Sequence, residues 1–114
     1  MSKLSFLRLD RKTGERTVPV AYRPLKITVG DVNHTLALHQ VAGEWRVSDP
    51  ISGGAIVWVQ GLYKGIPVSS KGLGVREATA RARVCVGALV DRVGGPAEWN
   101  ARIAHARATY AEAA

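Results

Sequence analysis

The chain changes its pattern near residue 75, and this change constrains the fold more than any other feature. Before it, short apolar runs alternate with glycine, proline, asparagine and aspartate, a pattern typical of strands joined by tight turns. After it lie 12 of the 16 alanines, and apolar residues recur at helical spacing. A length of 114 residues suits one domain. The sequence therefore predicts a single α+β domain over 1–114, an antiparallel β-meander followed by two helices.

The first predicted element is a basic N-terminal hairpin or arm over residues 1–24. Two apolar segments, Phe6–Leu9 and Thr17–Tyr22, flank a turn-rich stretch that contains Gly14. Pro19 has no backbone N–H, so this hairpin is expected at an edge or as a projecting arm. The meander follows over 25–60, which makes about four to five strands with the hairpin included.

Two segments of the predicted β-region carry more specific expectations. The run 55–60 is almost wholly apolar, which suits a strand covered on both faces. Residues 61–74 are predicted as a glycine-rich loop, with an irregular extra strand as the alternative. Its glycines allow close approach to a ligand, and Tyr63, Lys64 and Lys71 are candidate contacts. The spacing fits neither a P-loop nor a dinucleotide-binding fingerprint.

The helical part is predicted as a main helix over 75–94 and a C-terminal helix over 96–113. The apolar arc of the first helix consists of Ala78, Ala82, Cys85, Val86, Leu89 and Val93. Gly94 and Pro96 mark a stop and a restart. The second helix carries a narrow stripe that includes Trp99, Ile103 and Tyr110. We expect this stripe to pack on its own domain, and a dimer or partner interface is the alternative.

The net charge of +7 is concentrated at the N-terminus. Residues 1–26 hold seven bases and two acids (+5), 27–74 hold three of each, and 75–114 hold six bases and four acids (+2). A concentrated basic segment attracts polyanions, although charges also protect strand edges from aggregation. The candidate contacts to nucleic acid or a protein partner are Arg8, Arg11, Lys12, Arg16, Arg23, Lys26, Tyr63, Lys64 and Lys71. Tyr22, Trp58 and Tyr63 are candidate stacking residues.

No combination of residues indicates catalysis, a metal site or a cofactor. His34 and His39 are five positions apart on one predicted strand, which places them on opposite faces. Cys85 lies on the apolar helix face and is expected to be a small core residue. A single cysteine indicates a reducing, cytoplasmic setting. No apolar run approaches the roughly 18 residues of a membrane span, and the N-terminal apolar stretch is too short for a signal peptide.

The sequence therefore predicts a small basic binding protein without enzymatic activity. Nucleic acid or a nucleoprotein complex is the favoured partner, contacted through the N-terminal arm. One alternative is a protein-binding accessory or inhibitor of the phage or mobile-element type, such as an anti-CRISPR protein. Another is an oligomeric structural or assembly protein, for example a homodimer formed through Trp99, Ile103 and Tyr110.

Overall fold

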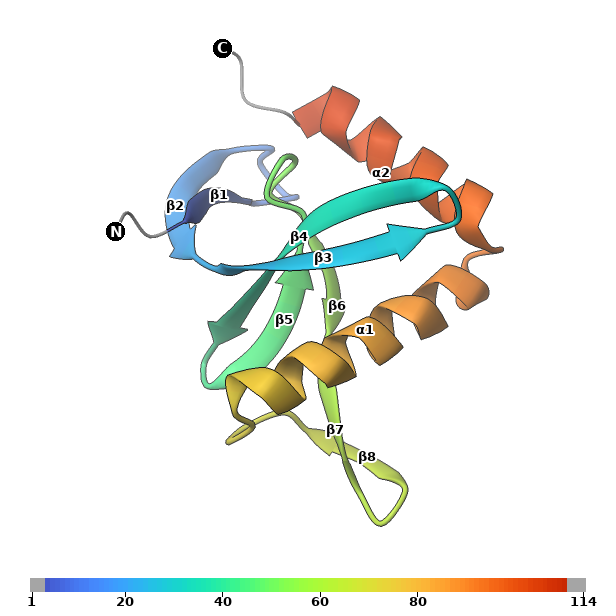
Figure 1. Ribbon diagram of the computed structural model, residues 1–114. Helices are drawn as coiled ribbons and strands as arrows, with labels where there is room; N and C mark the ends of the chain where they lie inside the picture. The colour runs from blue at the N-terminus through green and yellow to red at the C-terminus, as the bar shows by residue number, and fades with distance from the viewer. Residues whose placement is uncertain (1–3, 111–114) are drawn as a thin grey trace.

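The computed structural model describes residues 4–110, in which strands precede two helices (Figure 1). The strands are β1 (Ser5–Leu9), β2 (Arg16–Ala21), β3 (Arg23–Val29), β4 (Val32–Val41), β5 (Glu44–Ser48), β6 (Ala55–Trp58), β7 (Gln60–Tyr63) and β8 (Ile66–Ser69). The helices are α1 (Val75–Arg92) and α2 (Pro96–Tyr110). The strands form antiparallel sheets of order β1-β2, β3-β4-β5-β6 and β7-β8. The predicted α+β class, a meander followed by two helices, is confirmed. Residues 111–113 of the predicted second helix lie outside the described residues.

The core lies between the four-stranded sheet and the helices. Alternating residues of the central strands, including Leu36, Leu38 and Val47, point to the side covered by α1 and are fully buried. Helix α1 presents its alanines and valines to them, with Ala78 and Ala82 completely covered. Small side chains let the helix axis approach the sheet closely, so the helix side of the sheet is tightly packed.

The break between the helices follows the glycine and proline signals. Helix α1 ends at Arg92, and Gly94 and Gly95 both have positive φ. Pro96 opens α2, where its missing N–H costs no hydrogen bond. The two helices are therefore separate, as predicted, and Trp99 of α2 packs in the core.

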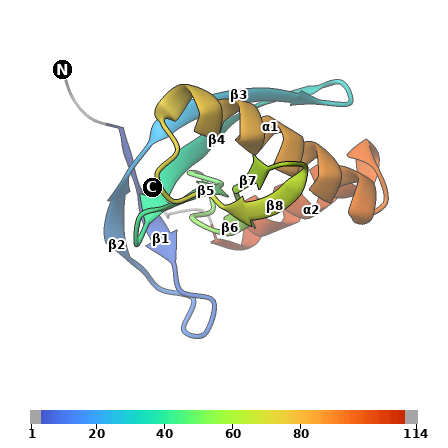
Figure 2. The same ribbon diagram turned by 90° about the horizontal axis from the view of Figure 1, so that it is seen from below.

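The β1–β2 hairpin forms a separate sheet on the side of the fold away from α1 (Figure 2). Phe6 packs edge-on against His39 of β4, with 5.3 Å between ring centroids. Leu9 N–H donates to the carbonyl of Gly53, 2.9 Å away. Gly53 has φ +78, and a Cβ there would lie 2.3 Å from the Leu7 carbonyl oxygen. Only glycine permits this approach, so the hairpin is docked onto the fold rather than free.

The prediction of a loop over 61–74 is wrong for most of that segment. The chain instead forms the β7–β8 hairpin, in which Tyr63 pairs with Ile66 across the turn residues Lys64 and Gly65. Both turn residues have positive φ, as a two-residue hairpin turn of this type requires. Figure 1 shows that the hairpin projects beyond the rest of the fold. Glycine at 61, 65 and 72 thus serves backbone geometry here.

The expectation that 55–60 is covered on both faces is also wrong. Strand β6 is an edge of the four-stranded sheet, and the helices cover only one side of it. Ala55 and Trp58 are therefore exposed, and Val57 packs against the core. An uninterrupted apolar run does not distinguish these two situations, because the covering elements come from elsewhere in the chain.

The predicted opposite placement of His34 and His39 is confirmed. His34 points to the helix side and meets the Trp99 ring edge-on, 5.0 Å between centroids. His39 points to the other side, towards Phe6. Both imidazoles are buried. His34 fills the space between the sheet and α2, and His39 fills the space between the sheet and the β1–β2 hairpin.

Candidate nucleic-acid interface

The side of the four-stranded sheet opposite the helices is only partly covered. Strand register places Lys26 beside Thr35, His39 beside Arg46, and Arg46 beside Trp58 on this side. The β1–β2 hairpin covers His39 and leaves Arg46 half-buried and Trp58 exposed. We call the set Arg8, Lys26, Arg46 and Trp58 the open-face cluster.

The centre of this cluster is an arginine stacked on a tryptophan. The Arg46 guanidinium carbon lies 3.8 Å from the centroid of the Trp58 ring. Trp58 is 42% exposed, a large value for an indole. The cation–π contact holds both planar groups in one orientation at the surface. An ordered, exposed guanidinium–indole stack is suited to receive a further planar or anionic group.

Among the described residues, no carboxylate forms an ion pair with the positive charges of the cluster. Burial, and secondarily the nearby Arg8 guanidinium, lower the pKa of Arg46 from its usual value. Within residues 4–110, the ion pairs join Arg102 to Glu98 and Arg107 to Asp49, and neither pair includes a residue of this cluster. Two guanidiniums that repel each other without a counter-charge attract an external anion.

His39 supports the cluster from below and adds no charge to it. Its Nε2 shares a 2.7 Å hydrogen bond with Ser48 Oγ. Burial, together with weaker repulsion from Arg46 and Arg8, lowers the His39 pKa to about 4. The imidazole is therefore neutral near pH 7. It fills the space between Phe6 and the sheet and leaves the surface charge to the arginines.

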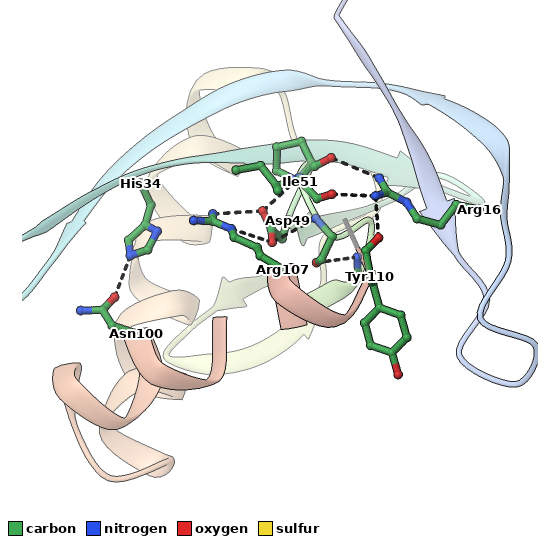
Figure 3. Close-up of polar contacts among 10 residues, drawn as sticks. Arg16, His34, Asp49, Ile51, Asn100, Arg107 and Tyr110 are labelled. Carbon is green, nitrogen blue, oxygen red and sulfur yellow. Dashed lines mark hydrogen bonds and ion pairs between the residues drawn. The ribbon is translucent and has the colours of Figure 1, made fainter. Parts of the chain in front are cut away.

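Arg16 is one of the predicted partner contacts, and in the structure its guanidinium is engaged within the protein itself. Its guanidinium is turned into the protein, where it donates to four backbone carbonyls, and Figure 3 shows the bonds to Ile51 and Tyr110. The acceptors belong to Leu7, Pro50, Ile51 and Tyr110, at 2.6–3.3 Å. A guanidinium saturated in this way ties the β1–β2 hairpin to the 49–54 loop and to α2. It has little capacity left for phosphate.

The other predicted basic residues divide between the surface and partial structural use. Arg11 donates one N–H to the Ala55 carbonyl at 3.0 Å and keeps its remaining donors. Arg8, Lys12, Arg23 and Lys26 are exposed. The basic arm is therefore still exposed at the surface, but its accessible charge excludes Arg16 and includes Arg8.

The residues predicted in the 61–74 segment lie in the β7–β8 hairpin and just after it. Tyr63 is 63% exposed in the projecting hairpin, and the Lys64 ammonium lies 5.4 Å from its ring centroid. Lys71 is exposed, and its aliphatic part runs close to Gly43. Tyr22, the third stacking candidate, is half-buried against Phe6. Trp58 and Tyr63 are thus the accessible rings among the three.

The candidate interface residues of α2 are largely turned inward. Trp99 is 3% exposed and belongs to the core, so it offers no ring surface to a partner. Ile103 packs against the same core. Tyr110 is half-buried, and its carbonyl accepts from Arg16. The stripe therefore packs mainly on its own domain, which was the first of the two expectations.

Arg46 is the residue that sequence reasoning missed. Its outward direction followed from strand alternation, but its place beside Trp58 requires the pairing of β5 with β6. A β-bulge between Val47 and Ser48 shifts that register. No local sequence pattern predicts this shift in the register between β5 and β6.

Three negative findings complete the description. In the described part of the chain, no group of three or more histidine, cysteine, aspartate or glutamate side chains is placed to hold a metal ion. Neither α1 nor α2 is long and apolar enough to cross a membrane. No protein-family model, curated protein or solved structure matches this chain.

Proposed function

We propose that this protein binds nucleic acid without catalysis, through the open-face cluster. The observation that carries the proposal is the Arg46–Trp58 stack at the surface, with Arg8 beside it and no ion pair to a carboxylate among residues 4–110. The single cysteine supports a reducing, cytoplasmic setting for this activity.

Each part of the cluster suits one part of a polynucleotide. Guanidiniums donate to phosphate oxygens in a forked geometry, so Arg8 and Arg46 are assigned to the backbone. The exposed indole of Trp58 is assigned to a base, because aromatic side chains stack on bases of any identity. A base inside a duplex has both faces occupied by its neighbours. The proposal therefore favours single-stranded DNA or RNA.

The test is a salt titration of binding by fluorescence anisotropy, with labelled single strands and duplexes between about 50 and 200 mM salt. The variant Arg8→Gln/Arg46→Gln should lower the salt slope for single strands by about 1.4, since each phosphate contact contributes about 0.7. Trp58→Ala should weaken single-strand binding about tenfold. The matched control is Arg76→Gln/Arg92→Gln, which removes the same charge from exposed positions of α1.

The results distinguish binding at the open-face cluster from non-specific attraction to the net positive charge of the protein. Equal losses in the open-face variant and the α1 control would show that only net charge matters. An absence of binding at the lowest salt would overturn the proposal.

A protein partner remains the second candidate because of one observation. The projecting β7–β8 hairpin exposes Leu62, Tyr63, Ile66 and Val68, an apolar group of the kind found at protein interfaces. This supports the accessory or inhibitor class. The variant Leu62→Ser/Ile66→Ser should leave oligonucleotide binding unchanged if the open face is the nucleic-acid site. A loss of that binding would move the site to the hairpin.

A further inference from the structure

A cleft on the helix side of the fold is not used by the proposed function. It lies between the 49–55 loop, strand β6, the end of α1 and helix α2, and its volume is about 430 Å³. Binding sites for small organic molecules have volumes of roughly 300–1,000 Å³. Its apolar lining consists of Leu9, Ile56, Leu89, Val93, Trp99 and Ile103.

The polar part of the lining is positively charged. The charge comes from the guanidiniums of Arg11 and Arg102, and the uncharged part of the polar lining includes Ser52 and Thr109. Arg11 uses one N–H on the Ala55 carbonyl, and Arg102 uses its Nε on Glu98 at 3.0 Å. Each guanidinium has five N–H donors, so both keep donors for a ligand.

The carboxylate in the lining does not oppose an incoming anion. Asp49 accepts two hydrogen bonds from Arg107, at 3.0 and 3.1 Å. It also accepts from the backbone N–H groups of Ile51 and Ser52. These partners hold the pKa of Asp49 below its usual value against the effect of burial. Its charge is thereby compensated within the protein.

We propose that this cleft binds a small amphipathic anion, with an apolar body and one carboxylate or sulfonate. The body lies over Leu89, Val93 and Ile103, and the anionic group faces Arg11 and Arg102. Apolar walls with a few convergent polar groups are the usual composition of such sites. The apolar lining comes mainly from α1, α2 and the core, while the open-face cluster lies on the other side of the sheet. The two sites are separate.

The experiment uses two probes that differ only in charge. One is 8-anilinonaphthalene-1-sulfonate, and the other is N-phenyl-1-naphthylamine, the same aromatic body without the sulfonate. Fluorescence titration of the full chain should give one sulfonate probe per chain, bound about tenfold tighter than the neutral probe. Arg11→Gln/Arg102→Gln should remove that tenfold preference and leave neutral-probe binding unchanged. Ala106→Leu, which narrows the cleft, should weaken both probes.

Controls assign the signal to the cleft and to the folded state. Arg76→Gln/Arg92→Gln on α1 and Arg8→Gln/Arg46→Gln on the open face should leave both affinities unchanged, and saturating oligonucleotide should not displace the probe. Each variant is first checked for a cooperative thermal transition, because this sulfonate also binds partly unfolded chains. Equal affinity for both probes, several probes per chain, or insensitivity to Ala106→Leu would overturn the proposal. None of these outcomes depends on whether the open face binds nucleic acid.

Discussion

Two regions of this molecule contain the same residue types and use them in opposite ways. The inner corner, where the 49–54 loop meets α2, contains Arg16, Asp49, Trp99 and Arg107. The open-face cluster contains Arg8, Arg46 and Trp58, with Lys26 further along the sheet. In the inner corner Arg16 donates to backbone carbonyls and Arg107 donates to the Asp49 carboxylate. On the open face the arginines have no acidic partner among the described residues.

The density of charged residues along a sequence is therefore not sufficient to locate a binding surface. Arg8 and Arg16 come from the same basic segment, eight positions apart. The Arg16 guanidinium donates to four backbone oxygens, whereas the Arg8 guanidinium is exposed near that of Arg46. Because a saturated donor cannot bind a partner, the supply of acceptors decides which arginine is structural.

The largest expected effect is the difference in unfolding free energy between variants of the two tryptophans, Trp99 and Trp58. Trp99→Ala should reduce the free energy of unfolding by about 3–5 kcal/mol, because a ring that is 3% exposed leaves a cavity in the core. Trp58→Ala should cost about 1 kcal/mol or less, since its ring is already 42% exposed. Urea denaturation of both variants measures the difference. Similar losses would contradict the contrast between the two regions.

The ion pair of the inner corner gives the next effect. Arg107→Met should cost about 3 kcal/mol, because it leaves the buried Asp49 carboxylate without its cation. The control Arg102→Met breaks an exposed pair with Glu98 and should cost less than about 0.5 kcal/mol. The deficit of Arg107→Met should narrow as the pH falls and Asp49 becomes protonated. A deficit that does not change with pH would indicate lost packing instead.

Substitutions of Arg16 and Arg8, the two arginines of the basic segment, should have opposite effects on stability and on oligonucleotide binding. Arg16→Met should cost about 2–3 kcal/mol through its lost carbonyl contacts and leave oligonucleotide affinity per folded molecule unchanged. Arg8→Met should change the unfolding free energy by about 0.5 kcal/mol or less and weaken oligonucleotide binding. Thermal unfolding and anisotropy on the same samples measure both quantities. The reverse assignment, a stabilising Arg8 and a binding Arg16, would contradict the structure.

The smallest effect concerns pH and the neutral His39 beneath the open face. Its pKa is lowered to about 4 in the folded chain and returns to about 6.5 on unfolding. The unfolded state therefore binds more protons as the pH drops below about 6.5, and stability decreases towards pH 4. Between pH 7 and about pH 5 the loss should be about 2 kcal/mol. The loss should shrink in His39→Gln and persist in the exposed control His105→Gln.

Local sequence patterns predicted much of the fold because short-range physics controls them. Two-residue alternation placed His34 and His39 on opposite sides of β4, and the Gly94–Pro96 stretch separated the helices. The β7–β8 hairpin was missed because its turn is Lys64–Gly65. The strongest turn signals of this type begin with asparagine, aspartate or glycine, and lysine rarely adopts positive φ.

The candidate site was predicted only in part. Arg8 and Lys26 are exposed, as a basic arm at the surface requires, Arg16 donates to backbone carbonyls, and Trp99 packs in the core as first expected. Arg46 was not among the predicted contacts, because its stacking on Trp58 depends on the pairing of β5 with β6. Pairing between strands brings distant residues together and has no signature within either segment.

The sequence by itself determined the element types, their order and the basic character of the N-terminal segment. These properties arise from propensities, periodicity and charge, which act over a few residues. Tertiary contacts determine which arginines bind oxygen acceptors of the protein, which tryptophan is exposed and where a cleft opens between the 49–54 loop and α2. Those outcomes depend on oxygen acceptors and covering side chains from distant parts of the chain. A residue's availability is therefore a property of the whole fold.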